Sequence, residues 1–421
     1  MSVTTQSAGV VSFEQAYKTV LEYCRQITPP PAEDVPLLEA LGRVLAAPVL
    51  ADRDFPPFPR ATRDGYALRA ADLKTTPATL RVSGQVKAGA AYAGQVTSGE
   101  AVEIMTGAAV PQGADTVVMV EYTSLRNGSA QSEAEVEVEI QRSAVAGENI
   151  VPAGAEARAG QEILSPGMRL GPAQIAMAAG AGKARISVYR RPRVAILPTG
   201  DELVEVAETP GTHQIRNSNS YSLATQVMVW GGEPMRLPVA PDEEDKLIAL
   251  IQAGLSTGML LLSGGVSMGK FDLVEQALKS LGAEFFFTGA LIQPGRPVVF
   301  GEVKVQRRRV PFFGLPGNPI STMVTFDLFA RPVLEALGGA VPARLPSAKA
   351  RLRKAVKAKT GLTRFLPAIL EGGLDDPEVE AIAWQGSGDL LASARANCYL
   401  VVSPDRDSIA AGEMVTVVMR A

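Results

Sequence analysis

The chain has 421 residues and carries 41 Lys and Arg against 44 Asp and Glu, a net charge of −3 at pH 7. This length predicts several domains, and the balanced charge argues against a nucleic-acid-binding protein, which needs a basic surface. No apolar run approaches the ~18 residues of a membrane span, and residues 1–11 lack the basic start and apolar core of a signal peptide. We therefore expect a cytoplasmic protein with no membrane or nucleic-acid partner.

The first predicted elements are helical. Residues 12–27 repeat apolar side chains with the helical period, and Ser12 with Gln15 resembles a capping box. Three prolines from Pro29 on end this helix, and a second helix is predicted over roughly 37–47.

From 52 to 141 the texture changes to short β segments separated by glycine and proline. The clearest strand is 136–140, where valine and isoleucine alternate with glutamate, which is typical of a half-buried strand. The segment 147–187 is rich in glycine and alanine and contains a predicted helix, 174–180, just after Pro172. We interpret 52–141 as a small all-β insertion.

An alternating α/β pattern follows from about 193 to 337 and predicts a mostly parallel sheet covered on both faces. Ligands of such sheets bind at the carboxyl ends of the strands. Short strands return at 399–402 and 414–419, which indicates a second β domain. The predicted α/β elements are strands 194–197, 235–239, 259–262 and 310–313, and helices 218–229, 243–253, 273–281 and 322–337.

Two glycine-rich loops are the most informative feature, Leu261–Gly269 and Gly314–Ser321. Each follows a short apolar strand and leads into a predicted helix. Glycines let backbone N–H groups approach an oxyanion, and a helix N-terminus adds partial positive charge. Either loop alone is more simply explained by turn geometry, but two in one α/β unit indicate a polyanionic ligand.

Four acidic residues, Asp201, Glu202, Asp242 and Asp272, follow strand ends at the same predicted edge. An isolated acidic residue before a helix is most simply a cap or dipole partner. Beside phosphate-binding loops, however, a group of carboxylates would repel the ligand unless a divalent cation lay between them, and Mg²⁺ suits such a site. The segment 216–219 opens the next helix and has plain N-capping as its simplest explanation.

The two cysteines and the single histidine limit the remaining chemistry. Cys24 and Cys398 cannot form a disulfide framework, which favours a reducing compartment. His213 lies in a predicted loop and is interpreted as a surface residue, so a His-based zinc site or a Ser–His–Asp triad is not expected.

From about Ser12 to its C-terminus the chain resembles the molybdopterin molybdenumtransferase family, called MoeA in bacteria, with the E domain of gephyrin as an animal relative. The resemblance depends on ordered motifs, among them Pro-Phe-Pro-Arg-Ala-Thr-Arg-Asp-Gly-Tyr-Ala and the glycine-rich loops. These motifs are 57–67, 104–107, 113–115, 198–202, 215–219, 263–269, 294–297 and 315–319.

This resemblance implies a multidomain α/β plus β fold and a homodimer whose cleft joins the α/β domain of one subunit to the β insertion of the other. It also implies insertion of molybdate, as co-substrate, into adenylylated molybdopterin, with Mg²⁺-dependent loss of AMP and a molybdopterin adenylyltransferase as the supplier of substrate. The implied domains are an elongated linker domain (1–51 and 142–190), a β insertion domain (52–141), a central α/β molybdopterin-binding domain (191–340) and a C-terminal β barrel (341–421).

The resemblance and the strand-end pattern together predict the site residues. Asp242 and Asp272 are the predicted metal ligands. The predicted catalytic residues are Asp64, Thr106, Glu202, Asp242 and Asp272. The predicted substrate-binding residues are Asp201, Asn217, Ser218, Ser263, Gly264, Gly265, Ser267, Arg296, Pro316, Gly317, Asn318 and Ser321.

The sequence departs from the family pattern at two positions. Gln293 stands where a lysine is common, and Lys270 stands where an acidic residue is common. These departures leave open whether molybdate or tungstate is the preferred oxyanion. Two other functions also stay open at this point: a non-catalytic scaffold, as gephyrin implies, and a generic nucleotide-dependent transferase, which leaves the Asp64 segment unexplained.

Overall fold

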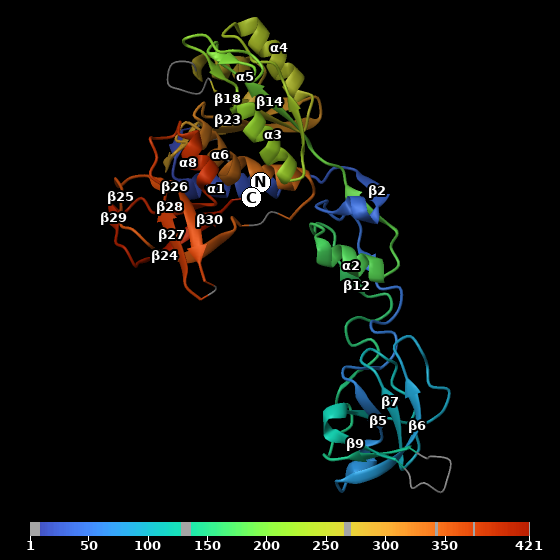
Figure 1. Ribbon diagram of the computed structural model, residues 1–421. Helices are drawn as coiled ribbons and strands as arrows, with labels where there is room; N and C mark the ends of the chain where they lie inside the picture. The colour runs from blue at the N-terminus through green and yellow to red at the C-terminus, as the bar shows by residue number, and fades with distance from the viewer. Residues whose placement is uncertain (1–8, 128–135, 265–270, 342–343, 374, 421) are drawn as a thin grey trace. The chain divides into compact units, whose positions relative to one another are not determined.

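The computed structural model describes residues 9–127, 136–264, 271–341, 344–373 and 375–420 (Figure 1). The chain divides into two compact units. One unit contains the residues up to Ala46, Pro166–Gly171 and those from Arg185 on, and the other contains Ala47–Ser165 and Pro172–Ala184. The boundaries of the four predicted domains stay a prediction. None of the described helices is long and apolar enough to cross a membrane.

The centre of the first unit is a six-stranded sheet in the order β17-β14-β18-β23-β22-β19. β17, β14, β18 and β23 are parallel to one another, whereas β22 is antiparallel to β23 and β19 is antiparallel to β22. The strands are β14 (Arg193–Pro198), β17 (Glu233–Arg236), β18 (Met259–Ser263), β19 (Ala283–Phe287), β22 (Val299–Val305) and β23 (Arg308–Leu315).

Helices cover both faces of this sheet because its strands alternate their side chains between two apolar clusters. Val194 and Ile196 of β14 pack with α1, α3, α6 and α7, whereas Ala195 and Leu197 pack with α4 and α5. Figure 1 shows this division, with α4 and α5 on one side of the sheet and α1, α3 and α6 on the other. The helices are α1 (Phe13–Cys24), α3 (Asn219–Val229), α4 (Glu244–Leu255), α5 (Phe271–Ser280), α6 (Pro319–Thr325) and α7 (Arg331–Leu337).

Most predicted elements are confirmed, but three differ. Only a 3₁₀ turn, Leu37–Ala40, forms where a helix over 37–47 was predicted, because Gly42 takes a φ of +74° and the next residues pair with distant segments. β17 ends at Arg236 instead of continuing to 239. The predicted helix 322–337 begins earlier, at Pro319, and contains a π-helical turn, Phe326–Ala330.

The π-helical turn places a buried acid against the C-terminal domain. Asp327 accepts hydrogen bonds from Tyr399 Oη (3.0 Å) and from Gln226 Nε2 (2.8 Å). Burial raises the pKa of Asp327, and these hydrogen bonds oppose that rise. Asp327 therefore joins α3, the π-helical turn and the barrel.

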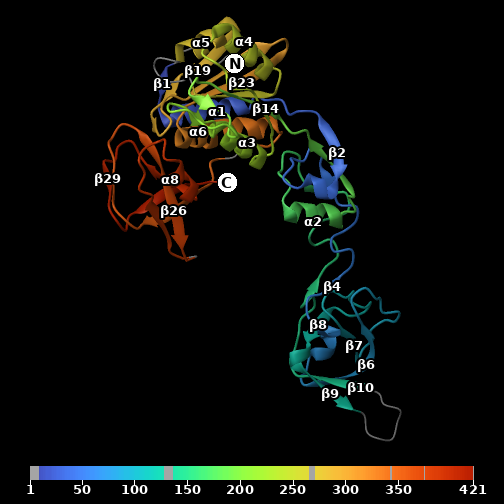
Figure 2. The same ribbon diagram turned by 45° about the horizontal axis from the view of Figure 1, so that its top comes forward.

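The C-terminal domain is a closed barrel in which β26-β27-β24-β30-β28 form a sheet and β28 returns to pair with β26. β21 (Ile292–Gln293) adds to the edge of β26 in parallel register, and α8 (Leu390–Arg395) lies beside β26 (Figure 2). The other elements are β24 (Ser347–Leu352), β25 (Val356–Lys357), β26 (Thr363–Gly372), β27 (Pro377–Ala381), β28 (Cys398–Val402), β29 (Ser408–Ile409) and β30 (Met414–Met419).

The second unit is built on a six-stranded sheet in the order β8-β5-β7-β6-β10-β9. Its predicted strand 136–140 is confirmed as β10, which buries Val138 and Ile140. The unit also contains α2 (Pro172–Gly180), β3 (Val49–Leu50), β4 (Arg60–Ala61), β11 (Ile150–Val151) and β12 (Glu162–Leu164). The sheet strands are β5 (Gly65–Leu68), β6 (Ala78–Val86), β7 (Glu100–Ile104), β8 (Thr116–Met119), β9 (Thr123–Asn127) and β10 (Val136–Ile140).

The predicted class, a mostly parallel α/β domain combined with β domains and a C-terminal barrel, is confirmed by this architecture. The parallel register decides where a site can form. Pro198 of β14 pairs with Ser263 of β18, which in turn pairs with Leu315 of β23. The three segments that follow these strands therefore begin side by side at the same edge of the sheet.

Candidate functional site

A cavity of about 640 Å³ lies at the carboxyl ends of the parallel strands. The turn after β14, the start of α3 and both glycine-rich loops line it, so the structure brings together motifs that lie far apart in the sequence. The predicted residues that line this cavity are Glu202, Asn217, Ser218, Ser263, Gly264, Gly317 and Asn318.

The two glycine-rich loops lie close together, and glycine is required at Gly264. Gly264 has a φ of +92°, and a Cβ there would lie 2.5 Å from the carbonyl oxygen of Thr199. A Cβ on Gly317 would lie 3.5 Å from the Cα of Gly264, so the loops approach at backbone level. Such close approach suits a ligand that is held by backbone groups.

The start of α3 is organised by Asn217 rather than by Ser218. The side chain of Asn217 is buried, and its Oδ1 accepts a hydrogen bond from the N–H of Ser220 at 3.2 Å. Ser218, at the N-cap position, makes no side-chain capping hydrogen bond. The capping explanation therefore accounts for Asn217, whereas the Ser218 side chain lines the cavity without that role.

Asn219 was not among the predicted site residues, although it holds the two loops together. Its Nδ2 donates to Ser263 Oγ at 3.1 Å and to the carbonyl oxygen of Gly317 at 2.6 Å. Its Oδ1 is buried and has no hydrogen-bond partner among the described residues, and the same holds for Thr199 Oγ1. Buried polar atoms are normally paired, and these two lie where the loops and the turn after β14 meet at the wall of the cavity.

The acidic residues at this edge are only partly brought together. Asp201 Oδ1 accepts from the N–H of Asp242 at 3.3 Å, and both residues are exposed. Glu202 lines the cavity and folds over Gly200. Within the described residues no three Asp, Glu, His or Cys side chains gather as a metal site. The side chain of Asp272, with Gly265, Ser267 and Lys270, lies outside the described residues.

A second cavity of about 320 Å³ lies beside the first and shares Asn318 with it. The predicted residues Arg296, Pro316 and Ser321 line it together with Leu362, Trp384 and Ser387 of the C-terminal domain. Asn318 Nδ2 donates to Ser387 Oγ at 2.8 Å, which connects the second glycine-rich loop to that domain. Ser387 was missed by the sequence analysis, since it belongs to no motif considered there.

In the second unit, the structure pairs the predicted residues Asp64 and Thr106. Asp64 Oδ1 accepts from the N–H of Thr106 at 2.6 Å and from its hydroxyl at 2.8 Å. These two hydrogen bonds lower the pKa of Asp64, although the carboxylate is exposed. The adjacent Gly65 is obligatory, because a Cβ there would lie 1.9 Å from the carbonyl oxygen of Val118.

Comparison with known proteins agrees with this geometry. Residues 11–182 match the MoeA N-terminal region (domain I and II), 195–336 match a "probable molybdopterin binding domain", and 349–419 match the MoeA C-terminal region (domain IV). The molybdopterin molybdenumtransferase of Haemophilus influenzae is 32% identical over 414 residues, covering 97% of this chain and 98% of that protein. The chain belongs to the molybdopterin molybdenumtransferase family.

Further relatives and solved structures extend the match. The molybdopterin molybdenumtransferase of Bacillus subtilis is 31% identical over 393 residues, covering 92% of this chain and 89% of that protein. The crystal structure of the molybdopterin biosynthesis moeA protein from Pyrococcus horikoshii OT3 superposes with a TM-score of 0.76 at 29% identity, covering 98% of this chain and 100% of that one. The predicted family is thus confirmed, and membership makes the chain a transferase of molybdenum cofactor biosynthesis.

Proposed function

We propose that this transferase inserts molybdate into adenylylated molybdopterin and releases AMP in the cytoplasm. The observation that carries the proposal is the pair of cavities joined at Asn318. One is framed by glycine-rich loops, as a phosphorylated ligand requires, and the other holds an arginine, as an oxyanion requires. Two reactants can therefore lie side by side, which favours reaction through proximity.

The larger cavity takes the pterin substrate. Its volume of about 640 Å³ is within the ~300–1,000 Å³ typical of small-molecule sites. The backbone of the loops and the start of α3 bind the phosphate end.

The smaller cavity takes the tetrahedral oxyanion. Arg296 supplies a fixed positive charge and fork-like donors, and Ser321 lines the same cavity from the start of α6. In the reaction the oxyanion binds next to the dithiolene of the pterin substrate. We propose molybdate as this oxyanion, in keeping with the name of the family.

The acidic residues fit a divalent cation of the Mg²⁺ type. Asp201 and Asp242 are exposed and adjacent, since Asp201 Oδ1 accepts from the N–H of Asp242 at 3.3 Å, and carboxylate oxygens are hard donors that suit this ion. We propose Asp242 and Asp272 as its ligands, with Glu202 orienting water or substrate at the cavity wall. When bound, the cation neutralises phosphate charge that would otherwise be repelled by these carboxylates.

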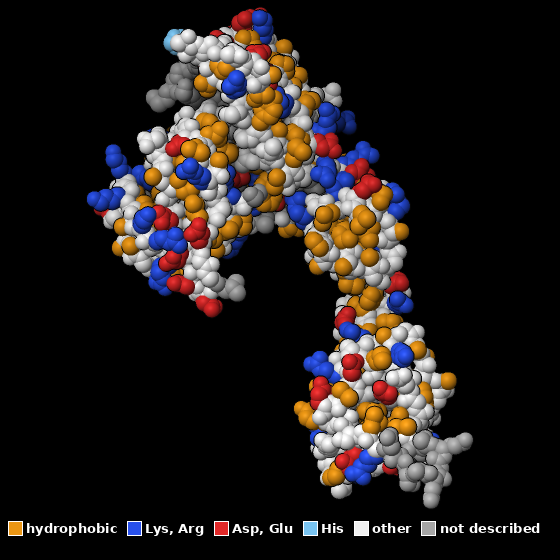
Figure 3. Space-filling model, viewed as in Figure 1, with side chains coloured by type: hydrophobic (Ala, Val, Ile, Leu, Met, Phe, Trp, Pro, Cys, Tyr) orange, Lys and Arg blue, Asp and Glu red, His pale blue; other side chains and the backbone are white. Residues whose placement is uncertain are grey.

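We further propose a homodimer in which Asp64 and Thr106 of the partner subunit complete the cleft. Apolar side chains that are exposed on the single subunit support this assembly. Leu38 is 84% exposed and Leu41 is 56% exposed in the first unit. In the second unit α2 buries only Ala178, and Figure 3 shows hydrophobic side chains gathered over the part that carries α2. A fully active monomer at micromolar concentration would contradict the shared cleft.

The decisive experiment incubates the protein with adenylylated molybdopterin, Mg²⁺ and molybdate and measures AMP. The substrate can be supplied by a molybdopterin adenylyltransferase, the proposed partner of the pathway. We expect AMP release that depends on molybdate and falls at least tenfold in Glu202→Gln, whose exposed side chain leaves packing intact. If the wild-type protein releases no AMP, the enzymatic proposal fails and the scaffold alternative gains.

A further inference from the structure

A third cavity, of about 510 Å³, lies on the C-terminal domain and has no part in the roles assigned above. It is framed by β21, β25, β26 and the segment after β27. Gln293 and Trp384 line both this cavity and the oxyanion cavity of Arg296, so the two adjoin. The side chains that matter here are Lys354, Lys357, Arg364, Glu380 and Trp384.

Arg364 is the unusual member of this set. It is only 7% exposed, yet its guanidinium makes a single hydrogen bond within the described residues, from Nη1 to the carbonyl oxygen of Leu362 at 3.1 Å. No Asp or Glu side chain in the described part of the chain forms an ion pair with it, and burial alone lowers its pKa. A buried charge without a counter-ion is costly, so such a group calls for an anion.

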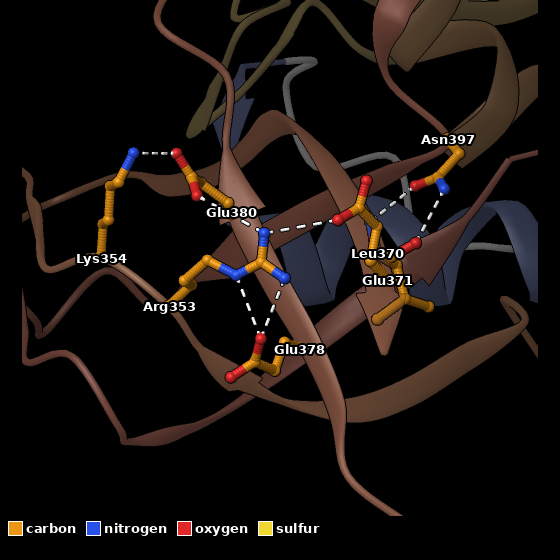
Figure 4. A network of polar contacts seen from close by, with 7 residues as sticks. All are labelled: Arg353, Lys354, Leu370, Glu371, Glu378, Glu380 and Asn397. Atoms are coloured by element: carbon orange, nitrogen blue, oxygen red, sulfur yellow. Dashed lines mark hydrogen bonds and ion pairs between the residues drawn. The ribbon is translucent and has the colours of Figure 1, made fainter. Parts of the chain in front are cut away.

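The neighbouring carboxylates are already engaged by other cations. Glu380 binds Lys354 at 2.6 Å, and Arg353 is bound by Glu378 at 2.9 Å and Glu371 at 3.3 Å (Figure 4). Figure 4 shows these acidic groups directed toward Arg353 and Lys354. The positive charge of Arg364 is therefore left to face the cavity.

Lys357 adds a second positive charge to the same cavity. It is exposed, and no ion pair is found for it among the residues that the structure describes. With Lys354 neutralised by Glu380, the lining carries a net charge of about +2 from Arg364 and Lys357. Gln293, the register partner of Arg364 on β21, offers an amide donor at the edge.

We propose that this cavity is a second anion site, which binds a doubly charged tetrahedral oxyanion group between Arg364 and Lys357. Trp384 and the apolar residues beside it give the remaining wall an affinity for organic surface. The cavity exceeds a single inorganic ion and falls within the usual range of small-molecule sites, so both a phosphate ester and a free oxyanion can enter. The choice of AMP and molybdate as probes rests on the proposed function, whereas the charge argument does not.

Calorimetric titration of the full-length protein with AMP, inorganic phosphate and molybdate tests the site. The variants are Arg364→Gln, Arg364→Lys and Lys357→Gln, and Arg296→Gln isolates the neighbouring cavity. The matched control is Arg351→Gln, since Arg351 is an arginine of the same barrel that already binds Asp376 at 3.2 Å. Urea unfolding of each variant verifies that the barrel is intact.

We expect wild-type protein and Arg296→Gln to bind the anion at this site with the same affinity. Arg364→Gln and Lys357→Gln should each lower that affinity at least tenfold. Arg364→Lys should keep part of the affinity, and Arg351→Gln should match wild type. AMP binding more tightly than phosphate and molybdate would assign a phosphate ester, and equal binding would assign a free oxyanion.

Unchanged affinity and stoichiometry for all probes in Lys357→Gln and in folded Arg364→Gln would overturn the proposal and leave Arg364 as a support for the Leu362 carbonyl. This readout is independent of AMP release. A protein that binds these anions through Arg364 but transfers no molybdenum would refute only the proposed function.

Discussion

Asn219 offers the sharpest test of the site, because one amide holds both glycine-rich loops. Asn219→Ala removes the hydrogen bonds of Nδ2 to Ser263 Oγ and to the Gly317 carbonyl. A typical hydrogen bond contributes ~0.5–1.5 kcal/mol net, so the pair contributes about 1–3 kcal/mol. If that free energy maintains the loop arrangement that binds substrate, binding weakens roughly 5- to 140-fold at ~1.4 kcal/mol per tenfold.

Asn219→Asp tests whether the hydrogen bonds of the Asn219 amide, rather than the shape of its side chain, hold the loops. The carboxylate has the shape of the amide, but it replaces a donor by an acceptor that faces the Ser263 hydroxyl and the Gly317 carbonyl. It also adds negative charge beside a phosphorylated ligand. We therefore expect Asn219→Asp to weaken substrate binding more than Asn219→Ala.

Asn397 provides the matched control. Its side chain also makes two hydrogen bonds to one backbone segment, accepting from Leu370 N at 2.8 Å and donating to Leu370 O at 2.9 Å (Figure 4). Urea unfolding should show comparable losses of stability for Asn219→Ala and Asn397→Ala. Titration with adenylylated molybdopterin should show weaker binding only for Asn219→Ala. Wild-type affinity in both Asn219 variants would refute the role of Asn219 in the loops.

Three further predictions follow from individual side chains. Thr106→Val should raise the lowered pKa of Asp64 part of the way toward its ordinary value of 3.8, because the backbone hydrogen bond remains; an NMR titration of the carboxylate that shows no change would contradict this. Because the pKa of Asp327 is raised in the folded protein, this residue stabilises the fold most below about pH 3.8 and less as the pH increases. The stability of Asp327→Asn relative to wild type should therefore increase with pH, which urea unfolding at several pH values measures. A constant difference at every pH would refute that assignment. Arg296→Ala should raise the molybdate concentration for half-maximal rate by at least tenfold with little effect on pterin binding, and Gln293→Lys should lower it modestly; unchanged molybdate dependence in Arg296→Ala would place the oxyanion elsewhere.

The sequence was sufficient for the α/β domain because its signals are local. Apolar runs such as 259–262 and 310–313 are short enough to be buried strands, and the loops after them necessarily lie at the carboxyl edge of a parallel sheet. The capping residue Ser12 was predicted on the same basis and is confirmed, since Ser12 Oγ accepts from Gln15 N. Periodicity failed at 37–47, where Gly42 and pairing with distant segments override an apolar pattern.

Only the tertiary structure decided which side chains meet. Asn219 contacts Gly317 across 98 positions of sequence, and Asn318 contacts Ser387 across 69. The isolation of Arg364 likewise depends on which carboxylates its neighbours already bind. The helical or strand period of a segment indicates which of its side chains are buried within that one element. These contacts depend instead on the order of the strands and on how closely the loops pack, and no local pattern in the sequence specifies either.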